Sequence, residues 1–189
     1  MSRGKHTPKQ TGYAPEDGIA MPDDFDDMLA IALEKPNPGT KQAYICSPCS
    51  GTKKDVAINI EAAVLYTKVA REMFHTRVQA PHAVLPFMLS DVIPYEREMT
   101  LRIGLELLKY SQLLYVCGDT VSTDMRNCIK EAARLRIPII VFSEDIRVEV
   151  RKIATQSGGR TVKIDGYPEY CPLALSPDEI VRLAGRKGL

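Results

Sequence analysis

Apolar positions along the chain alternate between short continuous runs and longer stretches with helical spacing. The runs are short enough for buried strands, and they lie at 43–46, 78–82, 113–117, 137–142 and 161–165. The intervening stretches repeat their apolar residues every three or four positions, as amphipathic helices do. These helices are expected at 55–75, 85–91, 94–110, 123–135 and 143–155, with a last one opening at Ser176. Strands that alternate with helices indicate an α/β fold with a parallel sheet.

The segment from Ser111 to Phe142 organises this fold, because it reads as strand, loop, helix and strand. Two buried strands joined through a helix can only be parallel, with a right-handed crossover. We therefore predict a doubly wound three-layer sandwich with a five-stranded parallel sheet in the order 2-1-3-4-5. In that order a ligand crevice forms where the loops 47–52 and 118–124 leave neighbouring strands.

The first 40 residues form an arm and a helical appendage outside the main domain. Residues 1–21 are polar and rich in Gly, Pro and Lys, whereas Pro22 opens a predicted helix that runs to about Glu34. One face of this helix carries apolar side chains, from Phe25, Met28, Leu29 and Ala32. The breaker 36–39 separates it from a single α/β domain at 41–189, so it packs on that domain or on another subunit.

The composition argues against a nucleic-acid polymer or a membrane as a partner. The 189 residues include 25 Lys plus Arg and 24 Asp plus Glu, a net charge of +1 that gives no electrostatic argument for a nucleic-acid polymer or a membrane surface. No apolar run approaches the roughly 20 residues of a membrane span. Five cysteines, an odd number, favour reduced thiols and a cytoplasmic location.

Candidate chemistry gathers at the ends of the first strands. The loop 47–52 holds small and hydroxyl residues that suit close approach of a polar ligand, although neither GxxxxGK[ST] nor GxGxxG is present. Asn59 faces either the crevice or solvent. His82 either contacts a ligand and donates a proton, since histidine titrates near neutral pH, or bonds a neighbouring loop.

Several segments in order resemble the nucleoside 2-deoxyribosyltransferase superfamily, and more closely a poorly characterised bacterial and phage branch of it. They are Tyr44–Pro48, Asn59, Ala80–His82, Glu96–Leu108, Cys117–Asp119, Val121, Ser122, Met125, Ile137 and Pro138. The resemblance implies transfer or hydrolysis at the N-glycosidic bond of deoxynucleosides or their monophosphates. It also implies a homo-oligomer in which neighbouring subunits often complete the pocket.

The resemblance assigns a nucleoside or nucleotide site with no cofactor. The binding residues would be Ser47, Ser50, Gly51, Asn59, His82, Gly118, Ser122 and Met125, with Asp119 or Ser122 bonding sugar hydroxyls. Cys128 stands at the position of the family's nucleophilic glutamate, and Gln112 stands where an aspartate often opens the third strand. Asp119 and Glu131 are the other candidates for a catalytic role.

The cysteine at position 128 leaves the activity open. A carboxylate stabilises the oxocarbenium-like transition state and forms a labile ester, whereas a thioglycoside would be harder to hydrolyse. We therefore expect glycosidic chemistry that is impaired or altered, in a transferase or hydrolase if the protein is active. One alternative is a protein that binds or sequesters a nucleotide without turnover. Another is a thiol or metal protein that uses Cys46, Cys49, Cys117 and Cys128.

Overall fold

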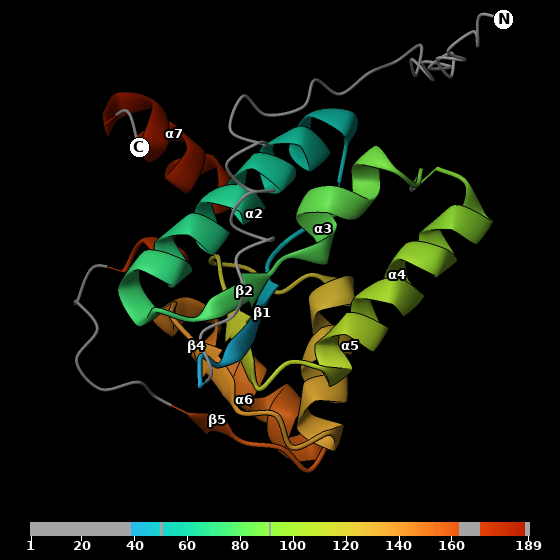
Figure 1. Cartoon of the computed structure of the whole chain (residues 1–189), viewed down its shortest axis with the longest axis vertical. Helices are drawn as coiled ribbons and strands as arrows, with labels where there is room; N and C mark the ends of the chain where they lie inside the picture. The colour runs from blue at the N-terminus through green and yellow to red at the C-terminus, as the bar shows by residue number, and fades with distance from the viewer. Residues whose placement is uncertain (1–38, 50, 91, 163–170, 188–189) are drawn as a thin grey trace, which may run out of the picture.

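The computed structural model describes residues 39–49, 51–90, 92–162 and 171–187. Its centre is a five-stranded sheet in the order β2-β1-β3-β4-β5, and every neighbouring pair is parallel (Figure 1). The strands are β1 (Gln42–Cys46), β2 (Arg77–Gln79), β3 (Leu113–Val116), β4 (Ile139–Val141) and β5 (Thr161–Val162). The predicted doubly wound α/β architecture and its strand order are confirmed.

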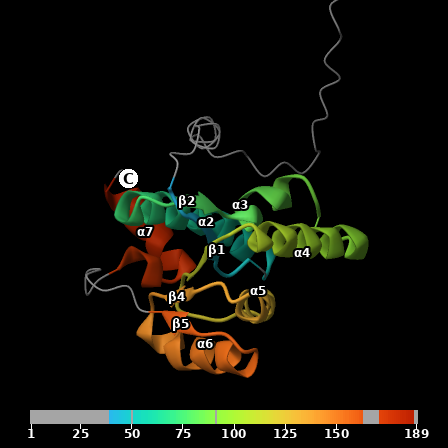
Figure 2. The same cartoon turned by 60° about the horizontal axis from the view of Figure 1, so that its bottom comes forward.

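Helices cover both faces of the sheet (Figure 2). One face packs against α2 (Lys53–Phe74), α7 (Pro177–Lys187) and the short helix η2 (Pro172–Ala174). The opposite face packs against α4 (Pro94–Lys109), α5 (Thr123–Arg134) and α6 (Glu144–Gln156). Alternate strand residues supply the two cores: Ala43 and Ile45 point to the α2 side, Tyr44 and Cys46 to the α4 side. This alternation follows from the period of two along a strand.

Side chains at the helix starts explain where the helices begin. Thr52 caps α2, with a reciprocal bond between its backbone N–H and the Asp55 carboxylate at 2.8 Å. The Ser122 hydroxyl accepts a hydrogen bond from the N–H of Met125 at 3.3 Å and so caps α5. Such bonds satisfy N–H groups that have no partner within the helix. Caps therefore fix the ends of both loops that border the predicted crevice.

The second predicted strand is wrong in its last part. The strand β2 ends at Gln79, and Pro81 begins the helix α3 (Pro81–Val84). Proline suits the first position of a helix, because its fixed φ is helical and its missing N–H would have no partner there. The short helix expected at 85–91 is confined to a 3₁₀ turn, η1 (Leu85–Phe87). The arm, the appendage at 22–34 and residues 163–165 of the last predicted strand lie outside the described residues.

The segment before α7 is joined to the core beside the loop that follows β3. The Tyr66 hydroxyl of α2 donates a hydrogen bond to the carbonyl of Leu175 at 2.6 Å. The N–H of Gly118 donates to the carbonyl of Leu173 at 2.9 Å. These two bonds hold the C-terminal part of the fold against one side of the β3 loop.

Candidate functional site

The loops at the carboxyl ends of β1 and β3 lie side by side at the switch point of the sheet, where successive strands are added on opposite sides of β1. The helix after β1, α2, lies on one face, whereas the helix after β3, α5, lies on the other. The N–H of Cys117 donates to the carbonyl of Cys46 at 2.9 Å, so the loops start as neighbours. Ligands of doubly wound proteins bind at this switch point.

Close packing between the loops requires glycine at position 118. Gly118 has a φ of +90°, and a Cβ there would lie 3.3 Å from Cδ of Pro48. A larger residue would meet both backbone strain and crowding at this position. Pro48 and Gly118 are therefore a close contact between the two loops.

Ser47 and His82 form a hydrogen-bonded pair at one side of the crevice. The Ser47 Oγ and the His82 Nε2 are 2.7 Å apart, although the residues are 35 positions apart in the chain. Ser47 is buried, and burial lowers the pKa of His82 to about 4. His82 is therefore neutral at pH 7, with a ring nitrogen held by a hydroxyl that can either donate or accept.

Neutral His82 predicts a pH dependence of stability. The unfolded chain binds a proton on His82 near pH 6.5, whereas the folded chain binds it only near pH 4. The free energy of unfolding should therefore fall as the pH drops from 6.5 towards 4, by at most roughly 3 kcal/mol, and should be unaffected by this group above 6.5. Urea unfolding at pH 7 and pH 4.5 measures the fall, which should be smaller in His82→Gln. An equal fall in both proteins would contradict the assignment.

Asp124 is the carboxylate that the structure brings to the start of α5 beside the loop after β1. Its Oδ2 lies 3.1 Å from Nη2 of Arg97 and accepts a hydrogen bond from the Cys49 thiol at 3.8 Å. The Asp124 side chain is 11% exposed and that of Arg97 is 38% exposed. A loop, α4 and α5 thus meet at one largely buried charge, which the arginine compensates.

Cys128 lies one turn further along α5, against the core that contains Tyr44 and Cys46 of β1. The neighbouring Cys46 thiol lowers the pKa of Cys128, burial opposes it, and the Tyr44 hydroxyl lowers the pKa further. Gly104 of α4 makes room for this contact, because a Cβ there would lie 3.1 Å from the Tyr44 hydroxyl. Cys128 is therefore a partly buried thiol whose surroundings favour the thiolate.

The remaining predicted binding residues lie at the loop ends or under them. Asn59 and Met125 are buried, and the carbonyl of Met125 accepts a hydrogen bond from the Cys46 thiol at 3.9 Å. Gly51 has a φ of +145°, and a Cβ on it would come within 2.6 Å of the Asp55 side chain. Ser50 lies outside the described residues.

The two other candidate catalytic carboxylates, Asp119 and Glu131, have different neighbours. Asp119 is partly buried, and its charge contributes to raising the pKa of Tyr66, after burial and Cys117. Glu131 binds the guanidinium of Arg134 at 2.8 Å and 2.6 Å, on the later part of α5. The described contacts join Asp119 to the side of the crevice near Tyr66, but they do not join Glu131 to any crevice residue.

Arg97, the partner of Asp124, is not indicated by the sequence pattern. It lies in the stretch Glu96–Leu108 that carried the resemblance, but its neighbours Glu96 and Glu98 make the segment read as a charged helix start. The signal that could have identified it is a lone cation in the first turn of a helix, where acids are favoured by the helix dipole.

The four thiols proposed for a metal or redox site are divided between the two faces of the sheet. Cys46 belongs to the core on the α4 side, and Cys117 belongs to the core on the α2 side. Within the described ranges, no group of three or more His, Cys, Asp or Glu side chains is arranged to hold a metal ion. No helix in that part of the chain is long and apolar enough to cross a membrane.

The strand order and the helices on both faces define a doubly wound α/β protein. The chain belongs to the family described as a domain of unknown function, DUF7768, whose model matches residues 41–142. Among solved structures it is similar to a 2-deoxyribosyltransferase from the psychrotolerant bacterium Bacillus psychrosaccharolyticus. That match has a TM-score of 0.49 and 15% identity, over 72% of this chain and 98% of that one. No curated protein matches the sequence.

Proposed function

We propose that the crevice between the loops after β1 and β3 binds a nucleoside or nucleotide. The observation that carries the proposal is that the loop after β1 contacts His82 through Ser47 and the Asp124–Arg97 pair through Cys49. These groups offer a neutral imidazole, hydroxyls and a compensated carboxylate, which suit the hydroxyls and amides of a nucleoside. The order of residues that resembles nucleoside 2-deoxyribosyltransferases supports the same ligand class.

In this proposal the loop after β3 binds the sugar of the ligand. The Ser122 hydroxyl accepts from Met125, which leaves its own hydrogen to donate to a sugar oxygen. Asp119 follows Gly118 directly and supplies acceptors for a sugar hydroxyl. Self-association, which the resemblance also implies, belongs to the proposal, and sedimentation velocity at micromolar concentration should show a species heavier than the 21.0 kDa chain.

In this proposal the protein binds its nucleotide but does not turn it over efficiently. Position 128 carries a thiol instead of a carboxylate, and the nearest carboxylate on the same side of α5, Asp124, is neutralised by Arg97. A glycosidic transition state needs a negative charge to stabilise the developing cation on the sugar. A Cys128 thiolate supplies such a charge, but the thioglycoside that it forms would be harder to hydrolyse than the ester of a carboxylate. We therefore propose a nucleotide-binding protein whose glycosidic chemistry is impaired or altered.

The binding proposal is tested by calorimetric titration with deoxynucleosides and their 5′-monophosphates. Asp119→Asn should weaken the tightest ligand about tenfold or more, because hydrogen bonds to charged groups contribute about 1.5–3 kcal/mol. Asp178→Asn is the matched control, since Asp178 is exposed in the first turn of α7. Equal affinities in the two variants would place the sugar elsewhere, and absence of binding to the whole panel would overturn the proposal.

A further inference from the structure

Cys46 and Cys128 are neighbouring thiols between β1 and α5. Cys46 is the last residue of β1, and Cys128 lies in the second turn of α5. The Cys46 thiol donates a hydrogen bond to the carbonyl of Met125 at 3.9 Å. That carbonyl belongs to the turn before Cys128, and helical side chains point back over the turn that precedes them. Both sulfur atoms therefore lie over the same turn of α5.

Packing and charge both make Cys128 the partner of Cys46. Cys128 packs against the buried cluster to which Cys46 belongs. It raises the pKa of the Cys46 thiol more than burial does, whereas Cys49 raises that pKa least. The Cys49 thiol donates instead to Oδ2 of Asp124 at 3.8 Å. The CxxC spacing of Cys46 and Cys49 therefore does not describe the pair that the structure brings together.

The two thiols differ in access and in proton affinity. Cys46 is buried, and Cys128 and burial together raise the pKa of Cys46. Cys128 is only partly buried, and the Cys46 thiol lowers its pKa. A peroxide reacts with the more accessible thiolate, and a second thiol beside it can then attack the oxidised sulfur. Cys128 therefore has the features of the first thiol to be oxidised, and Cys46 has those of the resolving thiol.

We propose that Cys46 and Cys128 are an oxidation site at which hydrogen peroxide forms a disulfide between β1 and α5. A disulfide needs the two Cβ atoms within about 3.5–4.5 Å of each other. Cys46 ends its strand and is followed by a loop, which adjusts more easily than the middle of a strand. The proposal does not depend on any ligand in the crevice, because the two thiols and the oxidant are the only reactants.

The oxidation takes place in two steps. In the first, the Cys128 sulfur attacks one oxygen of the peroxide, so that an S–O bond forms, the O–O bond breaks, and hydroxide leaves and takes the thiol proton as water. In the second, the Cys46 sulfur attacks the sulfenic sulfur of Cys128. The S–S bond forms, the S–O bond breaks, and the departing hydroxide takes the Cys46 proton. Two thiols and one peroxide thus give one disulfide and two water molecules.

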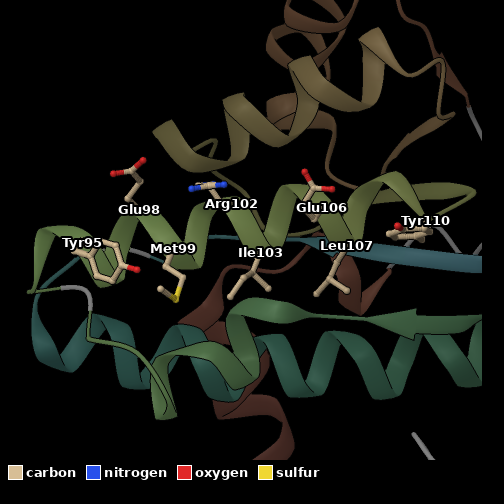
Figure 3. Close-up of a pocket in the computed structure, with 8 residues that line it drawn as sticks. All are labelled: Tyr95, Glu98, Met99, Arg102, Ile103, Glu106, Leu107 and Tyr110. Atoms are coloured by element: carbon tan, nitrogen blue, oxygen red, sulfur yellow. The ribbon is translucent and has the colours of Figure 1, made fainter.

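Methionine side chains compete for the same oxidant. Met88 is 72% exposed, and Met99 lines a hollow of about 510 Å³ on α4, where its sulfur is near the end of the side chain (Figure 3). Oxidation of methionine adds one oxygen atom, whereas the disulfide removes two hydrogen atoms. The mass of the protein therefore distinguishes the two reactions.

Mass spectrometry of the full-length protein tests the site. The reduced protein is treated with an equimolar amount of hydrogen peroxide, the remaining thiols are alkylated, and the intact mass and the digested peptides are measured. We expect a loss of two hydrogen atoms per chain, a linked peptide pair that contains Cys46 and Cys128, and complete reversal by dithiothreitol. A different pair of cysteines, a link between two chains, or no link at all would overturn the proposal.

Single serine variants separate the roles of the thiols. In Cys46→Ser, oxidation of Cys128 should stop at the sulfenic acid, which dimedone traps. In Cys128→Ser, Cys46 should remain a thiol after the same treatment, because it is buried. Cys49→Ser is the matched control and should form the disulfide as completely as the natural protein does. Loss of the disulfide in Cys49→Ser, or a dimedone adduct on Cys46 of the Cys128→Ser variant, would overturn the proposal.

Discussion

Replacing Cys128 with glutamate should create or strongly increase release of free base from deoxynucleosides or their 5′-monophosphates. The thiol lies on α5 one turn beyond Asp124, next to Tyr44 and Cys46. The proposed function aligns it with the nucleophile of the superfamily that the sequence resembles. Loss of an activated nucleophile lowers rates by several powers of ten. A carboxylate at this position should therefore raise the rate of base release about 100-fold or more above that of the natural protein. Chromatography of the released base measures it.

Cys128→Gln is the matched control for this experiment, because it has the size of glutamate without the charge. Extra atoms in a packed position destabilise by about 1–3 kcal/mol, and both variants share that effect. The glutamine variant should release base no faster than the natural protein. Rapid release by the natural protein would contradict impaired chemistry, and Asp124→Asn would then show whether the neighbouring carboxylate has taken over the role.

Gly159→Ala should be among the most destabilising single substitutions at a residue far from the crevice. A Cβ on Gly159 would lie 2.4 Å from Cβ and 2.5 Å from Cα of Ala133, so the end of α6 would be pushed away from α5. Backbone atoms cannot move aside as a flexible side chain can. We expect a loss of about 3 kcal/mol, equivalent to a melting temperature about 6–12 °C lower. Thermal unfolding followed by circular dichroism measures it.

Gly185→Ala, the same substitution at an open position, should raise the stability instead of lowering it. Gly185 lies within α7, and nothing is within 4 Å of the position its Cβ would take. Alanine in an open helical position stabilises by about 0.5–1 kcal/mol, because it restricts the unfolded chain and favours the helix. If both variants melted at the same temperature, the close contact between Gly159 and Ala133 would be wrong.

The sequence was sufficient to predict the sheet because burial leaves a strong local pattern. The runs that became β1, β3 and β4 are apolar throughout, since helices cover both faces of a central parallel strand. Ser122 caps α5, and Ser176 and Glu179 cap α7 reciprocally. Such caps can be predicted from sequence because they depend on residues within one helical turn. The edge strand β2 is only three residues long, and Pro81 obscured its end.

Partners that are distant in sequence could not be predicted. Nothing in the local sequence around Ser47 indicates that His82 will meet it, because the contact depends on how α3 returns to the sheet. The same holds for Arg97 and Asp124, which come from different helices. The strand order brings the loops that carry Ser47 and Asp124 to the same edge of the sheet, but the pairing of these side chains with His82 and Arg97 depends on the packed structure.

Mapping of nucleotide-induced chemical-shift changes tests the central claim most directly. The full-length protein is titrated with a panel of deoxynucleosides and their 5′-monophosphates, and backbone amide signals are followed. The account predicts that the perturbed residues cluster in the loops after β1 and β3 and at His82, including Gly51, Gly118 and Ser122. Perturbations that cluster on α7 or along α4, with the loop signals unchanged, would contradict it.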